Sequence, residues 1–208
     1  MTRPPTQAKN RIAEALDFPR ASAEVEVSVV APLYNEESTL AALVDRISDA
    51  LTDRRYEIVF VDDGSRDGSW AEILALAAKH PSVVRGYRLR SNSGKAEALA
   101  TGFAHASGRY VVTIDADLQD DPSEIPALLA KLGEGYDLVS GWKQRRQDPW
   151  SKTIPSRFFN FASRAASGLK LHDFNCGLKA YRREALANLR LYGELHRFIP
   201  ILVQADGF

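Results

Sequence analysis

Residues 109–121 read RYVVTIDADLQDD. The run YVVTI is aromatic and β-branched, a composition typical of a strand that is buried on both faces. The run ends at carboxylates, because Asp115 follows it and Asp117 comes two residues later. Residues two apart point to the same side of an extended chain, so both carboxylates face one way. Gln119 is in phase as a third oxygen donor if the extension persists.

The side chains at these three positions are hard oxygen ligands. Such ligands, with coordination positions left open, suit a Mg²⁺ or Mn²⁺ ion that also holds a diphosphate. The alternative is a solvated acidic loop after a strand, because Asp-x-Asp pairs are common by chance. The pattern of the surrounding sequence favours the metal site.

The chain on either side of this segment alternates between strand-like and helix-like patterns. Strands are predicted at 25–34, 56–61, 83–89, 110–114 and 136–140, and helices at 38–51, 70–80, 96–106 and 124–132. Strands that alternate with helices at this spacing imply right-handed crossovers. We therefore expect an α/β fold with a mostly parallel central sheet flanked by helices.

A polar cluster follows each predicted strand. The clusters are Tyr34-Asn35-Glu36, Asp62-Asp63-Gly64-Ser65, Asn92-Ser93-Gly94-Lys95, Asp115-Ala116-Asp117 and Gly141-Trp142-Lys143. In a parallel sheet the carboxyl ends of the strands share one rim, and ligands bind beyond that rim. The clusters therefore predict a metal and phosphate site there.

Two common classes of nucleotide-binding protein are disfavoured by the same clusters. The P-loop pattern GxxxxGK[ST] does not occur, since Gly94-Lys95 is followed by Ala96, and no GxGxxG follows the first strand. A P-loop NTPase and a Rossmann dehydrogenase are thus not expected. What remains is a sheet with paired carboxylates, in which Asp63 serves a base or ribose and the Asp115/Asp117 pair serves a metal-bound diphosphate.

The overall composition fits one globular domain. The chain has 208 residues, 45% of them hydrophobic and 26% charged. Residues 1–24 are expected to form a flexible lead-in with at most a short helix around Asn10 to Leu16. Residues 25–208 are expected to form the folded domain. The formal net charge of zero argues against a nucleic-acid partner. Cys176 is the single cysteine, so an internal disulfide is excluded and a small buried side chain is expected.

Five segments, in this order and spacing, resemble family 2 glycosyltransferases of the GT-A fold. They are VSVVAPLYNEE, IVFVDDGSRDGS, SNSGKAEALATGF, VVTIDADLQDDPSEIP and DFNCGLKAYRREAL. The nearest subgroup resembles the bacterial relatives of dolichyl-phosphate mannose synthase, which move a sugar from a nucleotide sugar to a polyprenyl phosphate. The resemblance covers the chain from about Val25 to its end.

The resemblance implies a role for individual residues. Asp63 is placed to accept a hydrogen bond from the base, and the DxDxQ segment to hold a divalent ion between the donor phosphates. The implied donor-binding residues are Pro32, Tyr34, Glu36, Asp62, Asp63, Lys95, Asp115 and Asp173. The implied metal ligands are Asp115, Asp117 and Gln119, and the implied catalytic residues are Asp115, Asp117 and Arg157.

The acceptor side is expected on the basic segment 141–170, which holds seven Lys or Arg residues and one Asp. A lipid phosphate is already an anion near neutral pH, so basic side chains need only position it. The candidates are Lys143, Arg145, Arg146, Lys152 and Arg157, of which Arg157 matches an acceptor-side arginine of the family. The amphipathic pattern of 154–171 suits a membrane surface, although such a helix more often packs on the core.

The sequence thus predicts an inverting, metal-dependent transferase with a UDP-glucose or GDP-mannose type of donor, inversion being implied by the resemblance alone. Two alternatives remain open: a family 2 transferase with a hydroxyl acceptor on a sugar or peptide, and a nucleotide-sugar-binding domain without turnover.

No apolar run approaches the roughly 20 residues that span a bilayer. A cytoplasmic location at the inner face of the cell membrane, with peripheral contact, is therefore expected. The chain is expected to be truncated, because relatives continue past Gly207-Phe208.

Overall fold

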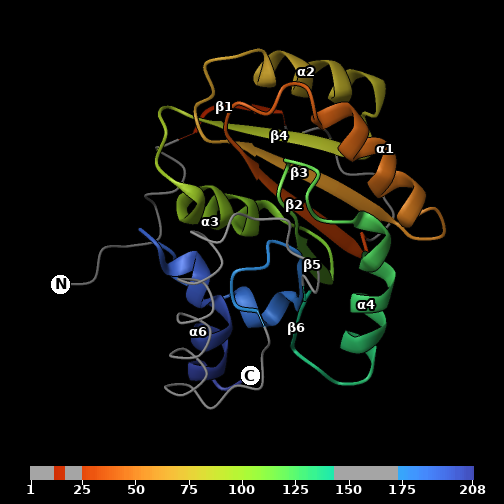
Figure 1. Ribbon diagram of the computed structural model, residues 1–208, viewed down its shortest axis with the longest axis vertical. Coiled ribbons are helices and arrows are strands. Elements are labelled where there is room, and N and C mark those ends of the chain that lie inside the picture. Colours follow the sequence, from red (N-terminus) through yellow and green to blue (C-terminus); the bar gives the residue numbers. More distant parts are fainter. Residues whose placement is uncertain (1–11, 17–24, 143–172) are drawn as a thin grey trace, which may run out of the picture.

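The computed structural model describes residues 12–16, 25–142 and 173–208 (Figure 1). The strands are β1 (Ile12–Leu16), β2 (Val27–Leu33), β3 (Tyr56–Asp62), β4 (Val84–Leu89), β5 (Tyr110–Thr113), β6 (Leu138–Ser140) and β7 (Lys179–Arg182). The helices are α1 (Leu40–Ala50), α2 (Ser69–Lys79), α3 (Lys95–His105), α4 (Ile125–Gly133) and α6 (Ile199–Ala205). Three short 3-10 helices are η2 (Pro122–Glu124), η3 (Arg183–Leu186) and η4 (Leu195–Phe198).

All seven described strands form one sheet in the order β1-β4-β3-β2-β5-β7-β6. Strands β4, β3, β2 and β5 pair in parallel, while β1 and β7 run antiparallel to their neighbours. Strand β6 is antiparallel to β7 and so runs in the same direction as β5. The mostly parallel α/β sheet is therefore confirmed, and the carboxyl ends of the five predicted strands point to the same rim.

Helices cover both faces of the sheet. Helices α1, α2 and α4 pack on one face, and α3 and α6 pack on the other (Figure 1). Strand β2 is buried along its whole length, and its side chains alternate between the two cores. Val29 contributes to the core under α1, whereas Val30 contributes to the core under α3. This two-sided burial explains why the central strands read as continuous apolar runs.

Helix α3 lies close to β2 because of a glycine. A Cβ atom on Gly102 would come within 2.3 Å of Val30 Cγ1, so no larger residue fits at this contact. Glycine is a poor helix former, and here it allows the close approach of helix to strand. The N-terminal residue of α3, Lys95, is thereby held beside the end of β5.

Two strands were not predicted from the sequence. Residues 12–16, expected in a flexible lead-in or short helix, form β1, which pairs antiparallel with the edge of β4 from Ile12↔Leu89 to Leu16↔Gly86. That expectation was wrong because the free edge of β4, rather than a local pattern in five residues, makes this segment a strand. Strand β7 was missed too, because four residues ending at Arg182 are too few for a clear pattern.

Cys176 lies in the core, with a side chain 3% exposed, as the sequence predicted. Burial raises the pKa of its thiol to about 11, which leaves little thiolate near neutral pH. The residue therefore acts as a small apolar side chain. Across the described residues, no helix has the length and apolar composition required to cross a bilayer.

A buried charged cluster joins β2, β3 and β4. Glu57 Oε1 accepts hydrogen bonds from the hydroxyls of Ser28 and Ser107, both at 2.6 Å. Its other oxygen lies 2.9 Å from Arg85 Nε, and the two charged side chains are only 1% and 7% exposed. A buried carboxylate with this many partners stabilises the sheet only while the whole cluster is intact.

We expect Glu57→Ala to lower the free energy of unfolding by about 3–5 kcal/mol, since it leaves the buried Arg85 without this carboxylate. Urea denaturation followed by circular dichroism measures the loss. The control is Glu26→Ala, which breaks a partly exposed ion pair with Arg54 and should cost about 1 kcal/mol or less. Equal losses in the two variants would contradict this account of the cluster.

Candidate functional site

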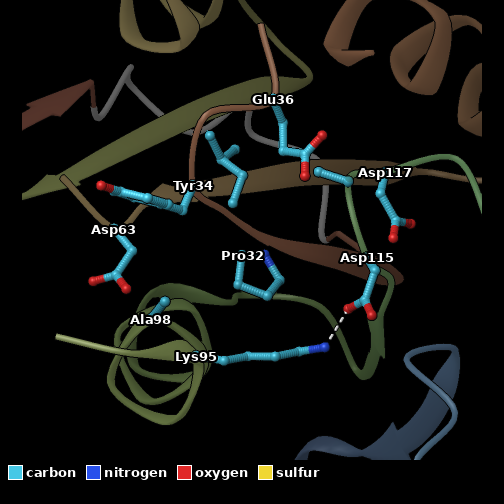
Figure 2. Close-up of a pocket in the computed structure, with 10 residues that line it drawn as sticks. Pro32, Tyr34, Glu36, Asp63, Lys95, Ala98, Asp115 and Asp117 are labelled. Atoms are coloured by element: carbon cyan, nitrogen blue, oxygen red, sulfur yellow. Dashed lines mark hydrogen bonds and ion pairs between the residues drawn. The ribbon is translucent and has the colours of Figure 1, made fainter. Parts of the chain in front are cut away.

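A cavity of about 240 Å³ lies at the rim where the parallel strands end (Figure 2). Its walls come from the end of β2 and the loop after it, the loops after β3 and β5, and the first turns of α3. The lining residues are Pro32, Leu33, Tyr34, Glu36, Asp63, Lys95, Ala98, Asp115, Ala116 and Asp117. Seven of these ten were singled out from the sequence, and the structure brings them together in one cavity.

The cavity has two chemically different ends. Figure 2 shows Asp63 and Tyr34 at one end, and Asp115 and Asp117 at the other, with Pro32 between them. The first end offers a ring and one carboxylate, which suits a nucleoside. The second end gathers negative charge, which suits a cation.

The carboxylate at the first end is fixed by backbone amides. Asp63 Oδ1 accepts from the N–H of Ser93 at 2.7 Å, and its Oδ2 accepts from the N–H of Gly94 at 2.8 Å. Gly94 has φ +92°, a conformation that favours glycine. Burial raises the pKa of Asp63, and the two amide hydrogen bonds oppose this rise. The carboxylate is thus held in one orientation, with oxygen lone pairs left to accept from a ligand.

The second end carries three carboxylates and one lysine. Lys95 Nζ lies 2.5 Å from Asp115 Oδ1, in an ion pair whose side chains are about one-third exposed. The pKa of Glu36 is raised, first by burial and then by the negative charges of Asp117, Asp67 and Asp115. The carboxylates repel one another because their negative charges lie close together. A cation bound among them would be attracted by each carboxylate and would relieve this repulsion.

Gln119 is not aligned with the aspartate pair. The chain turns after Asp115, and Leu118 adopts a left-handed conformation with φ +60°. Gln119 is exposed, and its backbone N–H donates to Asp117 Oδ1 at 3.1 Å. The extension needed to keep its side chain in phase with Asp115 and Asp117 is therefore absent. Its role as a metal ligand stays a prediction.

The donor atoms at the acidic end fit a Mg²⁺ or Mn²⁺ ion. In the part of the chain that the structure describes, no group of three or more His, Cys, Asp or Glu side chains is already arranged so that it could hold a metal ion by itself. Asp115 and Asp117 nevertheless face one cavity and present hard oxygen atoms. Mg²⁺ is commonly bound by one or two carboxylates together with substrate phosphates and water. Two carboxylates beside a cavity match that mode of binding.

Two predicted donor-binding aspartates are buried and are not among the residues that line the cavity. The side chain of Asp62 is completely buried, and its Oδ1 accepts from the N–H of Ser65 at 2.8 Å. Asp173 is 3% exposed, and its Oδ1 accepts from the N–H of Asn175 at 3.0 Å. Both side chains thus hold turns in shape. Their direct contact with a donor stays a prediction.

The acceptor-side predictions fall on residues 143–172, which lie outside the described residues. These include Lys143, Arg145, Arg146, Lys152 and the predicted catalytic Arg157. Their roles therefore remain predictions from the sequence.

Several residues of the site were missed from the sequence. Leu33, Ala98 and Ala116 line the cavity, but small or apolar residues after a strand carry no specific signal. Gly177 lies against the acidic end, since a Cβ atom there would come within 2.6 Å of Asp115 Cγ. Only the segment that contains Gly177 was singled out, through the family resemblance.

The sheet, its covering helices and the carboxylates at its rim define an α/β domain of the GT-A class of glycosyltransferase structures. The sequence profile described as Glycosyl transferase family 2 matches residues 28–190. The chain belongs to this family.

Two proteins with similar sequences are named as enzymes that act on polyprenyl phosphates. The undecaprenyl-phosphate 4-deoxy-4-formamido-L-arabinose transferase of Shewanella sediminis is 42% identical over 184 residues, covering 88% of this chain and 55% of that protein. The dodecaprenyl-phosphate galacturonate synthase of Rhizobium johnstonii is 37% identical over 183 residues, covering 86% and 54%. The chain therefore spans about half the length of these relatives.

A solved structure with the same fold contains both a metal and a donor. Glucosyl-3-phosphoglycerate synthase from Mycobacterium tuberculosis, in complex with Mn²⁺ and uridine-diphosphate-glucose, superposes with a TM-score of 0.67 at 31% identity. The match covers 87% of this chain and 64% of that one. That protein thus binds a nucleotide sugar together with a divalent metal.

We expect Glu36→Gln to raise the melting temperature at pH 7, because it removes a carboxylate that burial and its neighbours destabilise. The folded-state pKa of Glu36 lies above its ordinary value of 4.5. The folded state therefore binds more protons between these two values, and wild-type stability falls as the pH rises through that window. The gain should shrink at pH 4, as scanning calorimetry at both pH values would record. The control is Glu124→Gln, which changes an exposed carboxylate and should leave the melting temperature unchanged. A lower melting temperature for Glu36→Gln at pH 7 would contradict the electrostatic account.

We expect Lys95→Met to strengthen Mn²⁺ binding in the absence of nucleotide, because Lys95 Nζ occupies an Asp115 oxygen and repels cations. The gain should be roughly tenfold, the effect of about 1.4 kcal/mol. Electron paramagnetic resonance of free Mn²⁺ during a titration measures it. The control is Lys131→Met, which removes an exposed lysine paired with Glu134 at the C-terminal end of α4. It should leave the affinity for Mn²⁺ unchanged. Unchanged or weaker binding by Lys95→Met would be evidence against the competition.

Proposed function

We propose that this chain is the catalytic domain of an inverting, metal-dependent glycosyltransferase. It would transfer a sugar from a nucleoside-diphosphate sugar, of the UDP-glucose or GDP-mannose type, to a polyprenyl phosphate. The observation that carries the proposal is the single cavity with Asp63 at one end and the Asp115/Asp117 pair at the other. The names of the relatives support the acceptor class.

The nucleoside would occupy the end of the cavity formed by Pro32, Tyr34 and Asp63. The Asp63 carboxylate, fixed by two amides, accepts a hydrogen bond from a base N–H. The half-exposed ring of Tyr34, 38% exposed, offers an apolar face to the base or ribose. These contacts select a nucleotide without taking part in the chemistry.

The diphosphate would lie at the acidic end. Asp115 and Asp117, with Gln119 as a predicted third ligand, would hold Mg²⁺ or Mn²⁺, which when bound stabilises as a Lewis acid the negative charge of the departing diphosphate. Lys95 adds a second positive charge within reach of the phosphates once it leaves Asp115. Asp117 and Asp115 also fix the position of the reacting end of the donor.

The acceptor phosphate is itself the nucleophile, so the reaction needs positioning rather than a general base. The basic residues of 143–170, with Arg157 foremost, are proposed to hold it. Because polyprenyl phosphates reside in membranes, we place the domain in the cytoplasm, in peripheral contact with the inner face of the cell membrane.

Asp117→Asn tests the metal-bound donor directly. Calorimetric titration of the wild-type chain with UDP-glucose, GDP-mannose and UDP-N-acetylglucosamine, in Mn²⁺ and again in EDTA, should find one donor that binds only with metal. Asp117→Asn should weaken that binding by more than about tenfold, since a charged ligand is lost. The control is Asp121→Asn, the same substitution on an exposed residue four positions on. Unchanged affinity of Asp117→Asn in Mn²⁺ would defeat the metal assignment.

Turnover with the donor so identified separates the acceptor classes. Transfer to undecaprenyl phosphate, and not to phosphoglyceric acid or free sugars, is the expected result. Transfer to a hydroxyl acceptor would favour the second kind of family 2 enzyme, which needs a positioned carboxylate base. Binding without transfer or hydrolysis would favour a binding domain without turnover.

A further inference from the structure

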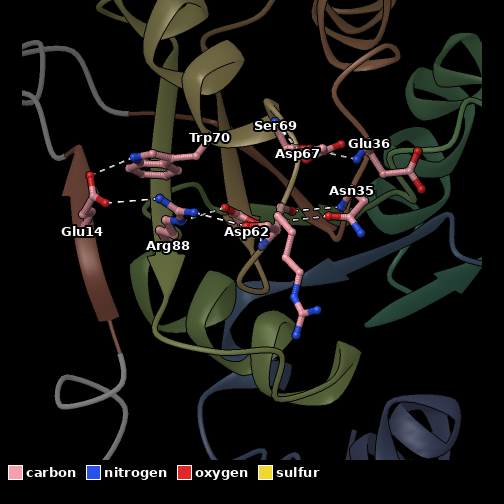
Figure 3. A network of polar contacts seen from close by, with 10 residues as sticks. Glu14, Asn35, Glu36, Asp62, Asp67, Ser69, Trp70 and Arg88 are labelled. Carbon is pink, nitrogen blue, oxygen red and sulfur yellow. Dashed lines mark hydrogen bonds and ion pairs between the residues drawn. The ribbon is translucent and has the colours of Figure 1, made fainter.

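The first described segment of the chain, β1, lies before the part that matches the family profile, which begins at residue 28. It pairs with β4, the strand next to β3. Its central side chain, Glu14, is exposed on the edge strand and points toward β4 and α2 (Figure 3). The segment thus lies outside the matched region and makes a charged contact with it.

Glu14 contacts two residues of that domain. Its Oε2 accepts from Trp70 Nε1 at 2.8 Å, and its Oε1 lies 3.4 Å from Arg88 Nη1. The guanidinium of Arg88 also lies over the indole ring of Trp70, 5.9 Å from its centroid. Glu14, Trp70 and Arg88 therefore form one unit, in which the edge strand holds the arginine from one side.

The other side of Arg88 faces the loop that follows β3. Its Nε lies 3.3 Å from Asp62 Oδ2, and its Nη2 donates to the carbonyl oxygen of Ser65 at 3.1 Å. Asp62 is fully buried. A buried carboxylate needs a cation or hydrogen-bond donors close by, and Arg88 supplies the cation. Arg88 thus fixes both ends of the turn from Asp62 to Ser65.

This turn and the start of α2 hold the loop after β2, which forms part of the cavity wall. Ser65 Oγ accepts from the N–H of Asn35 at 2.9 Å, and Ser69 Oγ accepts from the N–H of Glu36 at 2.9 Å. Asn35 has φ +58°, a left-handed conformation that asparagine adopts more readily than most residues other than glycine. Its side chain is held from the same loop, since the N–H of Arg66 donates to Asn35 Oδ1 at 2.8 Å.

We propose that Arg88 and Glu14 are positioning residues for the donor, through which β1 sets the affinity of the cavity. The chain of contacts runs from Glu14 to Arg88, then to Asp62 and Ser65, and from there to the loop that carries Tyr34 and Glu36 in the cavity wall (Figure 3). The proposal rests on the proposed function for what the cavity binds, and it assigns Asp62 to the scaffold rather than to the ligand.

Positioning of this kind has a distinct kinetic signature. If the loops are already held in the binding geometry, donor binding does not have to order them. Loss of the contact should therefore raise the dissociation constant and the KM for the donor while kcat stays the same. Asp115 and Asp117, at the reacting end of the donor, follow β5 and are not part of the loops that Arg88 contacts, so kcat should be unaffected.

The test uses Glu14→Ala and Arg88→Met, with Arg88→Lys as the conservative variant. Calorimetry with the donor bound by the wild type should give a weaker affinity, by about three- to tenfold, for Arg88→Met and a smaller loss for Glu14→Ala. Arg88→Lys should recover part of the affinity. Glu26→Ala, which breaks a comparable surface ion pair at the start of β2, should bind as the wild type does.

The outcomes separate this proposal from the proposed function. No donor binding by the wild type would defeat the proposed function. If the wild type binds the donor and both Glu14→Ala and Arg88→Met bind it with the same affinity as the wild type, the positioning role alone would be overturned. A fall in kcat with an unchanged KM would overturn it as well. Because Glu14 is exposed on an edge strand, Glu14→Ala keeps the test decisive even if Arg88→Met does not fold.

Discussion

The common direction of β2, β3 and β5 is the constraint on which the site depends. Parallel pairing brings the carboxyl ends of these strands to one rim, so that segments more than fifty residues apart in the sequence face one cavity. Asp63 comes from the loop after β3, while Asp115 and Asp117 follow β5. The buried cluster around Glu57 and the close packing of α3 on β2 keep this arrangement rigid, and rigidity is what a preorganised binding site requires.

Charge at the rim is balanced only in part. Three carboxylates, Glu36, Asp115 and Asp117, share the acidic end with one lysine, and the raised pKa of Glu36 reflects burial together with the repulsion among them. Such a site gains stability when a cation enters and when Lys95 finds a new anionic partner. A donor diphosphate bound with a divalent ion would provide both. The electrostatics of the cavity and of the proposed ligand are thus complementary.

Much of the fold and most of the cavity wall could be predicted from the sequence. The strand YVVTI and its neighbours were visible as apolar runs, and the polar clusters after them were placed on one rim because strand direction follows from the alternating pattern. Strand β1 could not be predicted, because it exists through pairing with the edge of β4. The turn at Leu118 and the buried positions of Asp62 and Asp173 also depend on tertiary contacts, which neither spacing nor resemblance reveals.

The most direct test of the account is to locate the metal. Crystals of the chain grown with Mn²⁺ and the donor selected by calorimetry would be measured at a wavelength where manganese scatters anomalously. The account predicts an anomalous peak at the acidic end of the cavity, in contact with Asp115 or Asp117 and with the donor phosphates. A peak elsewhere, or bound donor with no peak beside these carboxylates, would contradict it.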